Sequence, residues 1–197
     1  MLDSDSSYAY EIAAYTARSL SNNAHIERYY AEEVFEKAAS VDPTSTWKAV
    51  APYFESHDFS VTARFGNYFS EKSAKPLDIL SIDVIMDWIR EKPETRAVTI
   101  AQACAPALRD DRGKSLLARE LLASYGQHDR VKRALFARLG SYSWSGSQVD
   151  AINSKTQELR TYKQLETDAS ALQWITEAID MFESQVDNAR AREERDW

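Results

Sequence analysis

The tripeptide Gly113-Lys114-Ser115 matches the end of a phosphate-binding loop. In such a loop, glycine amides cradle the phosphate and the lysine reaches its outer oxygens. The glycine that the motif requires five positions earlier is replaced here by Leu108, and no strand is expected before it. We therefore expect Gly113-Lys114-Ser115 to start a helix, with a nucleotide site as the less favoured alternative.

The histidines and the single cysteine do not form a pattern that binds a metal or activates a nucleophile. No His-Glu-x-x-His spacing and no cysteine pair exists, so we predict no metal and no cofactor. His57 and His128 each precede an aspartate at comparable corners, which favours a structural role. Cys104 lies in an apolar stretch with no base to activate it, and Pro106 is expected to end that helix.

Paired acidic residues could in principle act as acid and base catalysts. The candidate pairs are Glu32 with Glu33 and Asp83 with Asp87. They are spaced along helices with no convergent partner, which is typical of a solvated helix face. The sequence therefore predicts no catalytic residues, and it favours a noncatalytic protein over an enzyme.

Residues 109–138 form a basic band in an acidic chain. Eight basic and four acidic side chains give the band a net charge of +4, whereas the whole chain carries −7. Its basic members are Arg109, Arg112, Lys114, Arg119, Arg130, Lys132, Arg133 and Arg138. Because phosphate affinity depends on lysine and arginine, the overall charge disfavours a nucleic-acid binder, and the band keeps that alternative open.

The elements that position these residues repeat along the chain. Segments opening at His57, Pro93, His128 and Leu165 begin 36, 35 and 37 residues apart. Each has a polar corner that can cap a helix, followed by apolar residues at spacings of three and four. The predicted core pairs are Val61 with Phe65, Ala97 with Ile100, Val131 with Leu135, and Ala169 with Leu172.

Each of these helices follows a partner helix, so the repeating unit is a helical hairpin. The predicted partner helices span 46–55, 77–91, 115–125 and 148–164, and residues 8–20 and 25–39 form a first hairpin. The sequence thus predicts one all-α domain over residues 1–197, with hairpins at about 6–40, 43–72, 76–110, 112–140 and 147–195. A single hairpin cannot bury its apolar face, so we expect about five to stack into an α-solenoid.

The corner sequences 129–135 and 93–98 resemble the start of the second helix in HEAT repeats, where an acidic or proline-containing corner precedes a basic residue and small residues. The resemblance covers about residues 43–185 and implies a right-handed stack whose second helices line a concave face. It also implies a scaffold that binds proteins, either alone or as part of a larger, bacterial-type repeat protein. Fold resemblance alone supplies no particular function.

On such a stack, Arg96, Arg130, Lys132 and Arg133 would approach the same concave face. They could bind an acidic protein or a neighbouring domain. One alternative is that they bind a phosphate backbone, as in a nucleic-acid-associated protein of the DNA-repair type. The other is that they are ordinary solvated arginines, some of them paired with Asp129 or Glu94. Trp144 is a further candidate as an aromatic anchor for a partner, although such a residue more often fills the gap between two hairpins.

Composition places the chain among water-soluble helical proteins. It has five glycines and five prolines in 197 residues, and its apolar stretches are too short to span a membrane. One cysteine excludes an intramolecular disulfide, and the start lacks the pattern of a secretory signal, so we expect a cytoplasmic protein that does not bind membranes.

Overall fold

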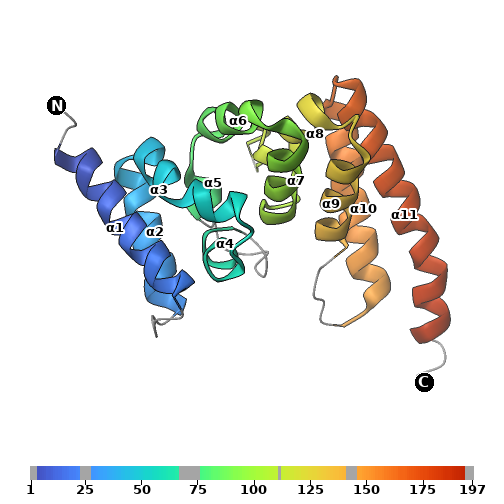
Figure 1. Cartoon of the computed structure of the whole chain (residues 1–197). Helices are drawn as coiled ribbons and strands as arrows, with labels where there is room; N and C mark the ends of the chain where they lie inside the picture. Colours follow the sequence, from blue (N-terminus) through green and yellow to red (C-terminus); the bar gives the residue numbers. More distant parts are fainter. Residues whose placement is uncertain (1–3, 23–27, 67–75, 111, 141–145, 194–197) are drawn as a thin grey trace. The chain divides into compact units, whose positions relative to one another are not determined.

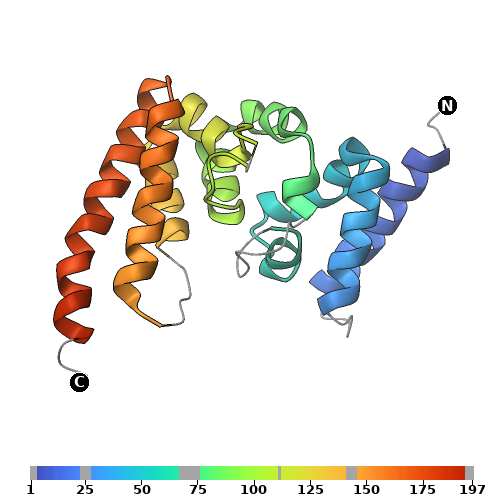
Figure 2. The same ribbon diagram turned by 180° about the vertical axis from the view of Figure 1, so that it is seen from behind.

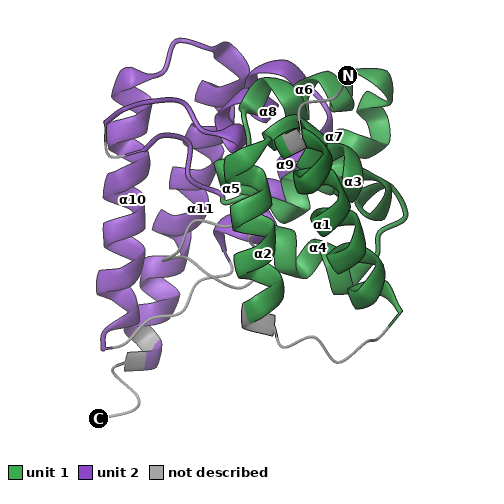
Figure 3. Ribbon diagram, turned by 90° about the vertical axis from the view of Figure 1, so that its left-hand side faces the viewer, with its two compact units in different colours: residues 1–105 green, residues 106–197 purple. Residues whose placement is uncertain are grey.

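The computed structural model of this chain describes residues 4–22, 28–66, 76–110, 112–140 and 146–193. These residues contain eleven α-helices and no strand, and an isolated bridge joins Arg109 to Ser115. The predicted all-α class is confirmed (Figure 1). None of the described helices combines the length and the apolar character needed to cross a bilayer. The chain divides into two compact units, residues 1–105 and 106–197 (Figure 3).

Unit 1 is organised around its third helix. Its helices are α1 (Ser4–Ser21), α2 (Arg28–Val41), α3 (Pro43–Glu55), α4 (Phe59–Phe65), α5 (Pro76–Ile79), α6 (Ile82–Glu91) and α7 (Pro93–Ala103). Helix α3 contacts α1, α2, α4, α6 and α7. It starts sharply because Pro43 occupies the first turn and the Asp42 carboxylate accepts the Ser45 amide at 3.0 Å.

An aromatic cluster forms the centre of unit 1. Trp47 and Phe54 of α3 lie 5.2 Å apart between ring centroids, and Phe65 of α4 lies 6.1 Å from Trp47 and 6.0 Å from Phe54. Phe35 of α2 meets Phe65 edge-on at 5.2 Å. These four side chains are at most 3% exposed, so rings from three helices share one core.

Unit 2 consists of two helical hairpins. Its helices are α8 (Leu117–Tyr125), α9 (Asp129–Leu139), α10 (Gln148–Leu165) and α11 (Ala169–Glu193). Helices α10 and α11 lie side by side along their length (Figure 2), and α8 contacts both α9 and α11. Trp174 of α11 is fully buried, stacks on Phe136 of α9 at 5.0 Å, and donates a hydrogen bond to the Lys132 carbonyl.

Each of the five predicted hairpin ranges contains two or three of the helices, and the hairpins themselves stay a prediction. Helices α1 and α2, α3 and α4, α5 to α7, α8 and α9, and α10 and α11 fall in the five predicted ranges in turn. Trp47 and Trp174 are buried, and Cys104 is fully buried. The stacking of all five hairpins into one right-handed array stays a prediction.

The predictions for α5–α6 and for α11 were wrong in part. The helix predicted over 77–91 is interrupted, because α5 ends at Ile79 and Ser81 adopts an extended conformation before α6. In α11, the predicted core pair is displaced, since Ala169 is exposed and Leu172 is half-buried. The Asp168 carboxylate accepts the Ala171 amide at 2.9 Å, and packing buries the face bearing Ala171, Trp174, Ile175 and Ala178 instead.

Gly126 allows close contact between α8 and α11. It ends α8 in a right-handed conformation, and a Cβ there would lie 2.3 Å from the Leu122 carbonyl oxygen and 3.0 Å from the Ser170 Cβ. Gly140 ends α9 in the same conformation, but its Cβ would meet nothing closer than the Phe136 carbonyl oxygen at 3.5 Å. The two glycines therefore differ in surroundings and not in backbone geometry.

We expect Gly126→Ala to lower the free energy of unfolding by about 1–3 kcal/mol, because backbone atoms must shift to admit the methyl group. Gly140→Ala is the matched control and should change it by less than about 1 kcal/mol, or raise it slightly by restricting the unfolded chain. Urea unfolding followed by circular dichroism measures both. Equal effects of the two substitutions would contradict the close-packing argument.

Candidate functional site

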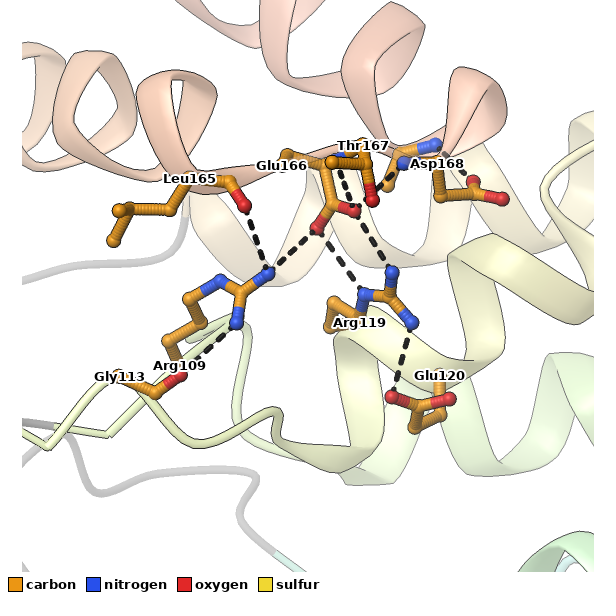
Figure 4. Close-up of polar contacts among 9 residues, drawn as sticks. Arg109, Gly113, Arg119, Glu120, Leu165, Glu166, Thr167 and Asp168 are labelled. Atoms are coloured by element: carbon orange, nitrogen blue, oxygen red, sulfur yellow. Dashed lines mark hydrogen bonds and ion pairs between the residues drawn. The ribbon is translucent and has the colours of Figure 1, made fainter.

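Two arginines of the basic band converge on one buried carboxylate inside unit 2. Arg119 lies in the first turn of α8, Arg109 lies in the loop before it, and Glu166 lies in the corner between α10 and α11 (Figure 4). The Glu166 side chain is 1% exposed. The two guanidinium groups therefore face the interior of the unit and are not part of a free surface.

The Glu166 carboxylate has several charged and polar donors. Arg119 binds it through two nitrogens, with Nη2 2.8 Å from Oε1 and Nε 3.1 Å from Oε2. The Thr167 and Asp168 amides each donate to Oε1 at 2.9 Å, and Arg109 Nη2 lies 3.4 Å from Oε2. A bidentate arginine pair with extra backbone donors is the arrangement that offsets the desolvation of a buried charge.

The donors also decide the charge of Glu166. Burial acts to raise the pKa of this carboxyl, but the hydrogen bonds from Arg119 and from the Asp168 and Thr167 amides outweigh it and lower the pKa to about 2. The hydrogen bond with Glu166 likewise raises the pKa of the Arg119 guanidinium. Glu166 is therefore a permanent anion at neutral pH and has no proton to give to a reaction.

Arg109 and Arg119 also tie the cluster to its neighbours. Arg109 Nη1 donates to the Gly113 carbonyl at 2.9 Å and Nη2 to the Leu165 carbonyl at 3.4 Å. Arg119 Nη1 donates to Glu120 at 3.1 Å. The cluster thus joins the loop before α8, the start of α8 and the α10–α11 corner, so its role is structural.

Arg96, the first predicted binding residue, is also engaged internally, in unit 1. Its side chain is 8% exposed, and its guanidinium carbon lies 4.4 Å from the centroid of the Trp88 ring. Its nitrogens donate to the Glu91 carboxylate and the Trp88 carbonyl, both at 2.6 Å, and to Glu55 at 3.2 Å. Lys92 pairs with the same Glu55 carboxylate, and its hydrogen bond is the main cause that lowers the pKa of Glu55.

The other three predicted residues lie on α9, with different exposure. The Lys132 side chain is 18% exposed and lies 3.7 Å from Glu177 of α11. Arg133 is 78% exposed, with an equally exposed partner, Asp129, at 3.8 Å. Arg130 is exposed and has no ion pair within the described part of the chain. Arg130 and Arg133, three positions apart, are therefore the predicted residues that present cations to solvent.

The remaining candidates carry no site in the residues that the structure describes. Trp144 lies outside those residues. Gly113-Lys114-Ser115 does not start a helix as predicted; it lies in a turn, two residues before α8 begins at Leu117. Asp110 accepts the Lys114 amide at 2.8 Å and the Gly113 amide at 2.9 Å, so these amides are not open to a phosphate.

The corner histidines and the paired acids do not converge either. His57 adopts a left-handed backbone conformation with φ of 56° between α3 and α4, and Asp58 caps α4. Asp87 pairs with Arg90 on the same helix face. Across the described residues, no three His, Cys, Asp or Glu side chains gather as metal ligands would.

Sequence reasoning identified the arginines but not their partner. Glu166 follows Leu165 in a predicted capping corner, and Arg109 and Arg119 belong to the predicted basic band. Glu166 lies 47 positions from Arg119 and 57 positions from Arg109 along the chain, and no periodic pattern in the sequence indicates such distant ion pairs. The signal in the sequence is limited to a glutamate in a predicted corner of a chain that also has a locally basic segment.

Comparisons of the chain with protein-family models, with curated proteins and with solved structures find no match. The likeness to HEAT repeats thus depends on the helical hairpins and the corner residues alone.

We expect Glu166→Gln to lower the free energy of unfolding by about 3 kcal/mol, because it removes the carboxylate that two largely buried guanidinium groups share and leaves Arg119 with Glu120 as its carboxylate partner. Urea unfolding at neutral pH measures this loss. Glu183→Gln is the matched control, since Glu183 pairs with Arg160 at 2.7 Å between α11 and α10 with both side chains about half exposed. The control should cost less than about 1 kcal/mol.

The stability that Glu166 contributes should also depend on pH. Its pKa is lowered from 4.5 to about 2 on folding, so its contribution is complete above pH 4.5 and is lost as the pH falls towards 2. The difference in unfolding free energy between wild type and Glu166→Gln should therefore shrink over that range. A difference that stays constant down to pH 2 would contradict the assignment.

Proposed function

We propose that this chain is a noncatalytic HEAT-like repeat module that binds an acidic surface of a partner protein. The observation that carries the proposal is the exposure of Arg130 and Arg133 on one face of α9. The five hairpins, stacked as a right-handed solenoid in a larger assembly, would serve as the scaffold that presents this face. A cytoplasmic location suits a chain that has a single cysteine, Cys104, and therefore cannot form an intramolecular disulfide.

The pairing of the basic band supports a protein partner over a nucleic acid. Arg109, Arg119 and Lys132 face carboxylates within unit 2, so three of the eight basic residues of the band are not available to neutralise a phosphate backbone. Arginine is enriched in protein interfaces, and an arginine at the rim of an interface steers an acidic partner through complementary charge. A pair of exposed arginines on a rigid helix suits this use.

Charge reversal tests the proposal. We expect tagged Arg130→Glu/Arg133→Glu protein to recover its acidic partners from a lysate at least about tenfold less than wild type, because like charges then oppose each other. The matched control is Lys163→Glu/Arg190→Glu, which reverses two exposed cations of the same unit, one of them 4.0 Å from an aspartate. Quantitative mass spectrometry of the three pull-downs measures the difference.

Equal recovery by all three proteins would show that α9 is not the interface. Fluorescence anisotropy with a labelled DNA duplex at low salt tests the nucleic-acid alternative. Binding that is lost in the α9 variant and in high salt would favour that alternative. Circular dichroism of each variant shows whether it remains folded.

A further inference from the structure

Helix α1 has a buried face of small residues and an exposed face that bears tyrosines. Ala9, Ala13 and Ala17 are fully buried, which lets α1 pack closely on α2 and α3. Tyr8 and Tyr15 are 62% and 70% exposed and lie seven residues apart, so their side chains project from the same side of the helix. Helix α1 thus exposes two large aromatic rings to solvent, while its alanine face packs against the neighbouring helices.

Exposed aromatic side chains are concentrated in the first hairpin. Among the described residues, the exposed aromatic side chains are Tyr8, Tyr10, Tyr15, Tyr30 and Phe59, and four of these five lie on α1 or α2. Tyrosine is enriched in binding interfaces because its rigid ring supplies contact area at low entropic cost. This concentration distinguishes the first hairpin from the rest of the described surface.

Glu11 lies between the two tyrosines on that face. It is three residues after Tyr8 and four before Tyr15, so its carboxylate is one helical turn from each ring. Its described contact is a hydrogen bond accepted from Ser7 at 3.4 Å, and no described lysine or arginine pairs with it. This exposed carboxylate, with an aromatic ring one turn away on each side, therefore has no cationic partner among the described residues.

A guanidinium group satisfies all three side chains at once. It can bind the carboxylate through two nitrogens and stack on a tyrosine ring, which an ammonium does less well. The same combination occurs within unit 1, where Arg96 lies over Trp88 and pairs with Glu91 and Glu55. Unit 1 is also acidic, with 16 acidic and 10 basic residues in 1–105, a net charge of −6.

We propose that Tyr8, Glu11 and Tyr15 of α1 form a docking surface for an arginine-bearing basic segment of a partner protein. This surface lies in unit 1 and has the opposite charge preference to the α9 face in unit 2. It therefore does not depend on the function proposed above, and the two can be tested separately.

The test is a titration of the isotope-labelled full chain with a blocked peptide of alternating arginine and glycine, followed by NMR. We expect shifts centred on residues 8–15, and weaker binding of the same peptide made with lysine. Tyr15→Ala/Glu11→Gln should weaken binding of the arginine peptide about tenfold, since it removes one cation–π contact and one ion pair.

The matched control is Tyr30→Ala/Glu33→Gln, which removes an exposed tyrosine and a partly exposed glutamate from α2 and should change the affinity less than about twofold. The Arg130→Glu/Arg133→Glu variant should bind the peptide like wild type. Equal losses in the α1 and α2 variants, or shifts spread over acidic residues generally, would overturn the proposal. A wild-type dimer that Tyr15→Ala/Glu11→Gln dissociates would identify a second copy as the occupant and overturn it as well.

Discussion

The buried Glu166 carboxylate is the constraint on which unit 2 depends. A charge that is 1% exposed is tolerated only if donors surround it, and its donors come from α8, from the loop before α8 and from the α10–α11 corner. Satisfying this one group therefore fixes how the two hairpins of the unit meet. Gly126 and the stacked rings of Phe136 and Trp174 pack at the same contact between the two hairpins.

Unit 1 follows the same principle with the charges exchanged. There a buried arginine, Arg96, is held by Glu55, Glu91 and the Trp88 ring, next to an aromatic core. In both units, basic residues near helix starts hold neighbouring helices together. The cations that pair with carboxylates inside a unit cannot bind a partner. Among the predicted residues, Arg130 and Arg133 therefore remain as the exposed pair.

The two proposed surfaces have different physical origins. The distribution of charge along the sequence indicates the α9 face, and the ion pairs in the structure reduce the number of cations that are available on it. The α1 face could have been noticed from the sequence, since Tyr8 and Tyr15 share a helical face, but the pattern equally suits a core stripe. Exposure decides between these interpretations, and exposure depends on which side of α1 packs against α2 and α3.

Local signals in the sequence predict most of the helices and their order. Polar corners that can cap a helix and apolar spacing of three and four are local signals, and they predict an all-α chain with hairpin corners near residues 57, 93, 128 and 165. Tertiary packing alone decided that Ala171 and Trp174, not Ala169 and Leu172, face the core, and that Arg96, Arg109 and Arg119 bind carboxylates. The physical reason is that burial and charge pairing join residues tens of positions apart, and the local sequence around an arginine does not contain the carboxylate that will neutralise it.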